Sequence, residues 1–321
     1  MSKSNFENIE NPQSVGDFLN FAGFLLKDFE NPTLEAELLL SLALEKDRVW
    51  LKTHHDYLLT AEEARKSREF LERRKNHEPL SYIRGWKMWC DMKIKVSPDV
   101  LIPRDETEIL ANYILENSPP PCRAQRDFEP KTILDIGTGS GCLAIFCGKK
   151  FPQAEITAID ICTKALKIAK KNAQTHKVKI NFIESDLLSC FQVSLEKGGF
   201  RGISEIPSLG SARDKLHFDI IIANLPYVPD DIEVTKDVKK EPHNAIFAGK
   251  DGLDLIRRLA GELKSKEISF CELWLEFWTA QEEEIKKIFA PSKSSGQAEF
   301  SVEFLPDLSG DTYFAKITPK K

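Results

Sequence analysis

Long apolar stretches are missing from this sequence of 321 residues, and none of its hydrophobic runs is long enough to cross a membrane. The N-terminal residues also lack the apolar core of a secretory signal. The seven cysteines form no Cys-x-x-Cys pair, and their number is odd. These features argue against a membrane protein, a disulfide framework and a zinc site. We therefore expect a cytoplasmic protein that binds no metal.

The sequence also lacks an excess of positive charge. Its 45 lysines and arginines and 50 aspartates and glutamates leave a net charge of −5. Proteins whose main partner is a nucleic-acid backbone carry the opposite balance. We therefore expect no direct nucleic-acid partner and no membrane partner. Hydrophobic residues at 41% and charged residues at 30% are typical of a globular protein, which we expect to be a monomer.

The length of the chain and the change of pattern along it indicate two domains. Helix caps and apolar faces of helical period fill residues 1–80, which we predict to be a small helical bundle that docks the substrate. Residues 81–103 carry Tyr82, Ile83 and two tryptophans before an alternating apolar and polar run, which predicts a short β-ribbon connector. Residues 104–321 would form the second domain.

Strand-like and helix-like stretches alternate from residue 131 onward, which predicts a doubly wound α/β domain with a mostly parallel sheet. The expected strands are 132–136, 155–160, 178–183, 217–224, 268–277, 300–304 and 313–317, the last two forming a terminal hairpin. The proline-rich residues 117–130 indicate a linker. Residues 192–214, with four glycines and a proline, indicate a surface insertion.

A glycine-rich turn, Asp135-Ile136-Gly137-Thr138-Gly139-Ser140-Gly141, lies between the first expected strand and its helix. Glycines allow a tight turn and a close approach of the backbone to a ligand, and the helix beyond offers free N–H groups. Asp160 ends the next strand, where a carboxylate can accept hydrogen bonds from ribose hydroxyls. The turn and the acid together predict a site for a nucleoside-containing cofactor.

Two details of this turn narrow the choice of cofactor. Cys142 stands where a dinucleotide fingerprint needs its third glycine, and no Gly-Lys-Ser/Thr follows as in a Walker loop. Asp135 would repel a pyrophosphate, but it suits an ammonium group. The pattern therefore favours S-adenosylmethionine. We expect Asp135 near its ammonium group, Asp160 at the ribose, Asp186 at the adenine edge, and loop amides at its carboxylate, from Gly137, Thr138, Gly139, Ser140 and Gly141.

A second chemistry-bearing stretch is the apolar run at 217–223, which stops at Asn224-Leu225-Pro226-Tyr227. Pro226 cannot donate to a strand ladder, so the strand should end at the sheet edge where ligands of open α/β sheets bind. The Asn224 side-chain oxygen and the Leu225 carbonyl would hold a planar NH2 group, and Tyr227 would stack on it. We expect Asn224, Pro226 and Tyr227 to be catalytic, because the held group would be aimed at the methyl group of the cofactor.

On these motifs the chain resembles the HemK/PrmC family of protein-(glutamine-N5) methyltransferases. The resemblance also rests on Leu-Ile-Pro-Arg-Asp-Glu-Thr-Glu at 101–108 and on the stretches at 31–40 and 78–85. It implies a Rossmann-like class I S-adenosylmethionine-dependent methyltransferase domain with a seven-stranded, mostly parallel sheet. It also implies cofactor contacts from Gly137 to Gly141, Asp160 and Asn224, and substrate-amide contacts from Asn224, Leu225, Pro226 and Tyr227. Arg104 and Glu106 would belong to the mouth of the substrate site.

The resemblance further implies methyl transfer to the glutamine of the Gly-Gly-Gln motif in class I peptide chain release factors. The sequence departs from the family pattern where Leu225 replaces the usual proline, and where Trp278 replaces a glycine in the stretch that carries Glu276 and Gln281. Two other interpretations stay open. One is an adenine-N6 methyltransferase on RNA or DNA, since a nucleobase amine is also a planar NH2 group. The other is a non-catalytic module that binds the cofactor or release factors.

Overall fold

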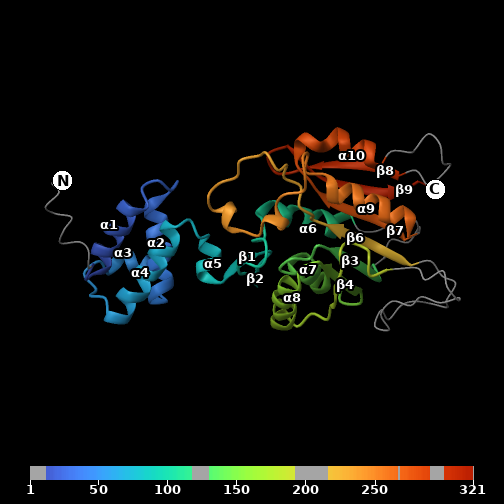
Figure 1. The fold of residues 1–321 in the computed structure, drawn as a ribbon. Helices are drawn as coiled ribbons and strands as arrows, with labels where there is room; N and C mark the ends of the chain where they lie inside the picture. The colour runs from blue at the N-terminus through green and yellow to red at the C-terminus, as the bar shows by residue number, and fades with distance from the viewer. Residues whose placement is uncertain (1–11, 118–129, 192–215, 267, 290–299, 321) are drawn as a thin grey trace. The chain divides into compact units, whose positions relative to one another are not determined.

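The computed structural model describes residues 12–117, 130–191, 216–266, 268–289 and 300–320 (Figure 1). The chain divides into two compact units, which are Met1–Gly85 with Thr235–Lys240, and Trp86–Val234 with Glu241–Lys321. The expected linker at 117–130 lies almost wholly outside the described residues, and the expected insertion at 192–214 lies wholly outside them. Among the described helices, none combines the length and the apolar character needed to cross a bilayer.

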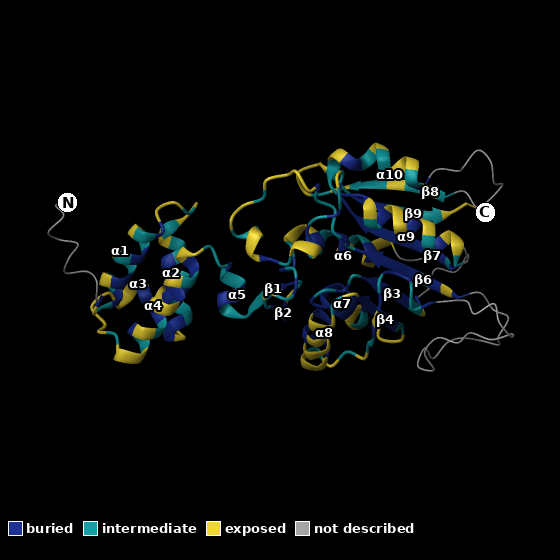
Figure 2. Cartoon of the chain, in the orientation of Figure 1, coloured by how far each residue is buried: buried dark blue, intermediate teal, exposed yellow. Residues whose placement is uncertain are grey.

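The first unit contains a bundle of helices, α1 (Val15–Leu25), α2 (Pro32–Leu44), α3 (Arg48–Thr53), α4 (Ala61–Lys75) and α5 (Leu80–Arg84). Side-chain hydrogen bonds from Ser14, Asn31 and Thr60 cap three of these helices, at the positions expected from the sequence. Their apolar faces meet in a shared core, whose largest members include Phe18, Leu39 and Leu71. Figure 2 shows the resulting bands of buried and exposed residues along α1, α2 and α4.

Arg74 of α4 holds a segment from far along the chain against this bundle. Its guanidinium donates to Glu35 at 2.8 and 2.9 Å and to Asp237 at 2.6 Å, and it lies over the ring of Phe29. Arg74 is buried, so the two carboxylates compensate a charge that would otherwise be costly to bury. The 3₁₀ turn η2 (Val238–Lys240) belongs to this segment, which the sequence analysis assigned to the second domain.

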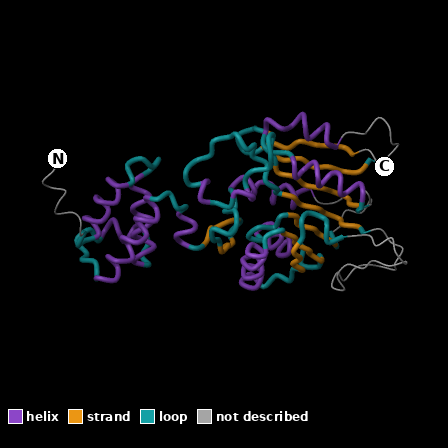
Figure 3. The backbone as a smooth tube through the Cα atoms, viewed as in Figure 1, coloured by secondary structure: helices purple, strands orange, loops and turns teal. Residues whose placement is uncertain are grey.

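The second unit contains a seven-stranded sheet in the order β5-β4-β3-β6-β7-β9-β8 (Figure 3). Its strands are β3 (Thr132–Ile136), β4 (Glu155–Asp160), β5 (Asn181–Glu184), β6 (His217–Ala223), β7 (Ser269–Glu276), β8 (Phe300–Pro306) and β9 (Thr312–Pro319). Strands β3 to β7 pair in parallel, whereas β9 pairs antiparallel with both β7 and β8. The predicted seven-stranded, mostly parallel sheet is therefore confirmed.

Helices cover both faces of this sheet. They are α6 (Asp105–Asn117), α7 (Cys142–Lys150), α8 (Thr163–His176), α9 (Asp254–Ser265) and α10 (Glu282–Phe289). The chain steps from β3 through α7 to β4 in one direction, and from β6 through α9 to β7 in the other. Because parallel crossovers are right-handed, the two steps put their helices on opposite faces. Strands covered on both faces read as nearly continuous apolar runs, and β6 is buried from Ile220 to Ala223.

The reversal of strand order between β3 and β6 fixes the position of the ligand crevice. Both strands point the same way, with Ile136 beside Ala223 at their carboxyl ends. In open α/β sheets a crevice opens where two connections leave in opposite directions, beyond the carboxyl ends of the strands. The glycine turn after β3 and the Asn224–Tyr227 stretch after β6 therefore meet at one edge, as the sequence analysis expected.

Several boundaries differ from the sequence-based prediction, most of them by one or two residues, and the largest differences are at the ribbon and at β5. Tyr82 and Ile83 were expected in the ribbon but lie in α5, which ends at Gly85 in a left-handed conformation with φ of 81°. The ribbon itself is shorter, with β1 (Trp86–Trp89) paired to β2 (Met92–Lys95). The strand expected at 178–183 is β5 at 181–184, because α8 extends to His176 and its last turn accepts the N–H of Val178.

Candidate active site

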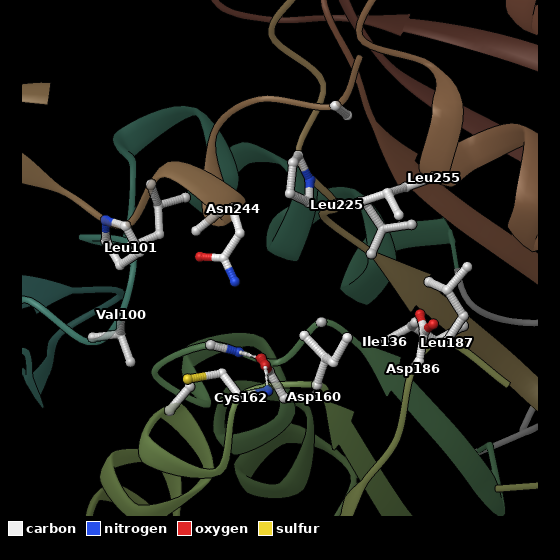
Figure 4. A pocket seen from close by; sticks show the side chains of 18 of the residues that line it. Val100, Leu101, Ile136, Asp160, Cys162, Asp186, Leu187, Leu225, Asn244 and Leu255 are labelled. Atoms are coloured by element: carbon white, nitrogen blue, oxygen red, sulfur yellow. Dashed lines mark hydrogen bonds between the residues drawn. The ribbon is translucent and has the colours of Figure 1, made fainter. Parts of the chain in front are cut away.

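A cavity of about 910 Å³ opens at the carboxyl ends of β3, β4 and β6 (Figure 4). Val100 and Leu101 lie at one end of it, and Asp186 and Leu187 lie at the other. The Asp160 carboxylate and the Asn244 amide face it from opposite walls. This size and this mixture of apolar walls with a few polar groups are typical of sites for small molecules and cofactors.

The glycine turn forms the floor of the cavity with Gly137 and Gly139. The backbone N–H groups of Gly137 and Thr138 donate to the Ile159 carbonyl at 2.9 and 3.0 Å, which ties the turn to β4. Gly137 has a φ of +72°, and a Cβ there would lie 3.0 Å from Cδ2 of Leu225. Leu225 fills that space, so a glycine is required to bring the two strand ends this close.

Three residues of the turn support its shape rather than line the cavity. The Thr138 hydroxyl donates to Asp135, the Ser140 carbonyl accepts from the Asn172 side chain, and Gly141 is the N-cap residue of α7. None of the three is among the cavity-lining residues, although the sequence analysis placed each of them at the cofactor. The structure thus brings Gly137 and Gly139 to the cavity and leaves Thr138, Ser140 and Gly141 behind it.

Asp135 is also placed behind the turn. Its carboxylate is buried and accepts the Thr138 hydroxyl at 2.6 Å, and it does not line the cavity. The pKa of Asp135 is raised to about 6, chiefly by burial; the hydrogen bond from Thr138 acts against burial, and the charge of Asp160 acts with it. This position allows Asp135 to act on a ligand through its field and through the turn, without direct contact in this structure.

Asp160 at the end of β4 points into the cavity and is held by the backbone. Its two carboxylate oxygens accept N–H groups, Oδ2 from Gly139 at 2.8 Å and Oδ1 from Cys162 at 2.8 Å. Only 9% of the residue is exposed, and this burial raises the pKa of Asp160 against the two hydrogen bonds. A carboxylate fixed in this way retains lone pairs that can accept from two adjacent hydroxyls.

Asp186 lies at the far end of the cavity, just beyond β5. Its carboxylate pairs with Arg258 of α9 at 2.9 Å, and both side chains are about half exposed. An exposed pair of this kind contributes little to stability. The cavity-lining residues Asp186, Leu187 and Arg258 therefore remain available to a ligand group that enters this end.

The stretch after β6 forms the opposite wall of the cavity, which is lined by Asn224, Leu225 and Pro226. The Asn224 side chain donates through Nδ2 to the Thr107 hydroxyl at 3.1 Å, and that hydroxyl lies 2.8 Å from Oε2 of Glu276. Thr107 lies in the first turn of α6 and Glu276 ends β7, so three separate segments of the chain meet at Asn224. The sequence analysis did not assign a role in the site to Thr107 or to Glu276.

Tyr227 is held by its hydroxyl and by its carbonyl. The hydroxyl donates to Oε1 of Glu276 at 3.1 Å, and the Gln281 amide donates to the carbonyl at 2.7 Å. The pKa of Glu276 is raised to about 7, chiefly by burial; the hydrogen bonds from Thr107 and Tyr227 and the nearby Asn224 amide act against burial, and the charge of Glu106 acts with it. Burial, followed by the Glu276 carboxylate, raises the pKa of Tyr227 well above its usual value, so it stays a neutral phenol.

Arg104 and Glu106, expected at the mouth of the substrate site, do not line the cavity. Arg104 pairs with the buried Glu241 at 2.7 Å, and the other oxygen of Glu241 accepts the Ile102 N–H at 2.9 Å. Glu106 is exposed on the first turn of α6. The Arg104–Glu241 pair thereby ties the stretch before α6 to the loop that carries Asn244.

Comparison with known proteins agrees with this architecture. Residues 17–85 match the model of the PrmC N-terminal domain, and residues 109–197 match that of the methyltransferase small domain. The release factor glutamine methyltransferase of Koribacter versatilis is 38% identical over 239 residues, which cover 74% of this chain and 75% of that protein. The chain belongs to the release factor glutamine methyltransferase family. The family member from Coxiella burnetii is 34% identical and covers 80% of this chain and 82% of its own length.

The resemblance to the HemK/PrmC family found in the sequence is thus confirmed, and family membership makes the protein an S-adenosylmethionine-dependent methyltransferase. Among solved structures, the ribosomal protein L11 methylase of Lactobacillus delbrueckii subsp. bulgaricus is 20% identical with a TM-score of 0.42. That likeness covers 71% of this chain and 84% of the other, and it is too loose to support any inference about function.

Proposed function

We propose that the protein methylates the side-chain amide of the glutamine in the Gly-Gly-Gln motif of class I peptide chain release factors, with S-adenosylmethionine as methyl donor. The observation that carries this proposal is the orientation of Asn224. Its Nδ2 donates to the Thr107 hydroxyl, and no described residue donates to its Oδ1, so that oxygen can accept from a ligand at the wall of the cavity. An acceptor at this wall suits an NH2 group, and family membership identifies the NH2 group as that of a glutamine.

The residues around the cavity fit S-adenosylmethionine, which supplies a methyl group on a positively charged sulfur when it is bound. Asp160 would accept from the ribose hydroxyls, because its carboxylate faces the cavity and is fixed by two N–H groups. The Gly137 and Gly139 backbone would hold the methionine end, and Asp186 the adenine edge. Asp135 would favour the ammonium group from behind the turn, by charge rather than by contact.

The protein's contribution to the reaction would be the grip on the glutamine amide. The Asn224 side-chain oxygen and the Leu225 carbonyl would accept its two N–H bonds, which raises electron density on nitrogen and aims it at the methyl carbon. Tyr227 would stack on the planar group while Pro226 fixes the backbone. As the nitrogen–carbon bond forms, the bond between the methyl group and the sulfur of the cofactor would break and the nitrogen would give up one proton to water, so the two acceptors would stabilise the positive charge that develops on the nitrogen.

The proposal extends to the docking of the release factor, the oligomeric state of the protein and its location in the cell. The helical unit that contains residues 12–85 would dock the release factor, and Arg104 and Glu106 would lie near the mouth of the substrate site. The protein would act as a monomer in the cytoplasm, where release factors work, without a direct nucleic-acid partner. Its acidic balance, with a net charge of −5, supports the last point.

The test is mass spectrometry of a purified class I release factor after incubation with the protein and S-adenosylmethionine. We expect one additional methyl group on the peptide that contains Gly-Gly-Gln, and no methylation when that glutamine is replaced by alanine. An adenine-containing oligonucleotide runs in parallel. Methylation of the oligonucleotide alone would establish the adenine-N6 alternative. Tight binding of the cofactor without transfer to either substrate would establish a binding module.

A further inference from the structure

A buried hydrogen-bonded chain links the acceptor of the proposed site to a carboxylate that does not contact the cavity. It runs from the Asn224 amide to the Thr107 hydroxyl at 3.1 Å, and from that hydroxyl to Oε2 of Glu276 at 2.8 Å. Thr107 is 2% exposed and Glu276 is 1% exposed, and neither lines the cavity. In sequence they stand 169 positions apart, so the fold alone brings them together.

The number of protons in this chain fixes its direction. An ionised carboxylate can only accept, so the single hydroxyl hydrogen of Thr107 goes to Glu276. The Thr107 oxygen is then left as an acceptor, and only the NH2 end of the Asn224 amide can meet it. The carbonyl end of that amide must face away from Thr107, and because Asn224 lines the cavity and Thr107 does not, this is the end that a ligand can reach. A buried network that is satisfied throughout holds one arrangement.

We infer that Thr107 and Glu276 are positioning residues, which hold the Asn224 amide with its oxygen toward the substrate nitrogen. The inference rests on the proposed function, since it assigns to these residues the orientation of the acceptor in that reaction. Glu276 has a second task, because its Oε1 accepts the Tyr227 hydroxyl at 3.1 Å. The Glu276 carboxylate therefore orients both the Asn224 amide, through Thr107, and the Tyr227 ring that would cover the substrate amide.

This orientation of the Asn224 amide would also make the site select a nitrogen over an oxygen as the reacting atom of the substrate. The carbonyl end of Asn224 attracts an N–H group and repels a carbonyl or carboxylate oxygen. An amide turned the other way would present its NH2 group, which would attract the substrate oxygen instead. The network thus favours a nitrogen over an oxygen at the reacting position, and a substrate with glutamate in place of the glutamine would be rejected.

Thr107→Val tests the inference, because valine keeps the shape of threonine and removes only the hydroxyl. Thr107→Ser is the matched control that keeps the hydroxyl. For Thr107→Val we expect kcat to fall at least about tenfold, while KM for the release factor and Kd for the cofactor stay within about threefold. Thr107→Ser should retain most of the wild-type kcat. Equal kcat in Thr107→Val and wild type, or equal losses in both variants, would overturn the inference.

A measurement without substrate separates this inference from the proposed function. Selective labelling with 15N-asparagine displays the side-chain amide of Asn224, which is assigned by its loss in Asn224→Ala. We expect its protons to be protected from exchange in the wild type and in Thr107→Ser, and unprotected in Thr107→Val. If the wild type fails to methylate a release factor but shows this pattern, the proposed function fails and the positioning network stands. If the side-chain amide protons of Asn224 exchange without protection in the wild type, the inferred hydrogen-bonded network is wrong.

Discussion

The carbonyl oxygen of Tyr227 lies 2.0 Å from the position that a Cβ on Gly252 would occupy. The same carbonyl accepts the Gln281 amide at 2.7 Å, and Gln281 also donates to the Asp251 carbonyl at 2.8 Å. The backbone of the proposed substrate-binding stretch, Asn224 to Tyr227, is therefore packed against a glycine and a side-chain amide. The position of Tyr227 depends on this packing as much as on the strand that precedes it.

Gly252→Ala should disturb the active site more than its backbone strain alone predicts. Gly252 and Gly310 both have positive φ, +73° and +93°, but a Cβ at Gly310 would meet nothing within 4 Å. Gly310→Ala is therefore the matched control, with an expected loss of about 1 kcal/mol from the left-handed backbone. Gly252→Ala should lose about 2–4 kcal/mol of unfolding free energy, because overpacking is added to the same strain.

Chemical denaturation measures the two losses, and methyl transfer to a release factor measures kcat. We expect kcat of Gly252→Ala to fall at least about tenfold through displacement of Tyr227, with Gly310→Ala close to wild type. Similar stability and similar kcat in the two variants would show that the contact with Tyr227 has no consequence.

Asn224→Ala should separate binding from turnover. The substitution removes the acceptor at the cavity wall and leaves Asp160 and the glycine turn intact. We expect the Kd for S-adenosylmethionine to stay within a few fold and turnover to fall at least about a hundredfold, as the loss of one positioned polar group in the transition state typically causes. Calorimetry and single-turnover kinetics give the two quantities. Asn76→Ala is the control, since it removes an amide at the exposed end of α4.

An unchanged turnover in Asn224→Ala would exclude Asn224 from the chemistry. A large rise in the Kd for the cofactor would instead place Asn224 mainly in the cofactor site.

Turnover should rise with pH through about 7. The positioning network needs ionised Glu276, and burial raises the pKa of that carboxyl to about 7. Below this pH the protonated carboxyl can donate, so Thr107 is no longer obliged to accept from Asn224. The groups that face Glu276 are Thr107 and Glu106 on α6 and Asn224 and Tyr227 after β6. The profile of kcat against pH under saturating substrate measures the midpoint.

Two variants give this pH dependence its control. Glu276→Gln removes the titrating group, so its kcat should be low and nearly independent of pH. Glu106→Gln should move the midpoint to lower pH, because the charge of Glu106 raises the pKa of Glu276. An identical midpoint in wild type and Glu276→Gln would assign the titration to another group.

Asp135→Asn should raise the unfolding free energy of the protein at neutral pH and lower its affinity for S-adenosylmethionine. Burial raises the pKa of Asp135 to about 6 from an ordinary value of 3.8. The folded state therefore binds the proton more tightly than the unfolded state. The contribution of protonated Asp135 to the unfolding free energy is complete below pH 3.8 and is lost as the pH rises through 6. The loss amounts to roughly 2–3 kcal/mol, since one pKa unit corresponds to about 1.4 kcal/mol.

Asparagine cannot ionise, but it still accepts from Thr138. We expect the unfolding free energy of Asp135→Asn to exceed that of the wild type by an amount that grows between pH 3.8 and about 6, the two pKa values, and is constant above that window. Denaturation curves at several pH values measure the growth, and calorimetry measures a lower affinity for S-adenosylmethionine. A constant difference across this range would show that Asp135 is ionised without cost.

The parts of the site that the sequence predicted are those encoded by neighbouring residues. Gly137 and Gly139 could be assigned because a turn between a strand and a helix needs glycines, and Asp160 because it ends the next strand. Thr107, Glu276 and Glu241 could not be assigned in the same way. Their roles depend on contacts between α6, β7 and a distant loop, and no periodicity or spacing in the sequence marks such contacts. Thr138 and Ser140 do not line the cavity, and their predicted contact with the cofactor stays a prediction.

The sequence by itself determined the alternation of strands and helices, the glycine turn, and the strand that ends in Asn224-Leu225-Pro226-Tyr227. Each follows from local conformational preference and from the period of apolar residues. Only the tertiary structure decided which end of the Asn224 amide faces the cavity, that Asp135 lies behind the turn, and that residues 235–240 belong with the helical unit. The physical reason is the same in each case. Hydrogen-bond direction and burial depend on which distant side chains pack together, and the packing of the whole chain sets those neighbours.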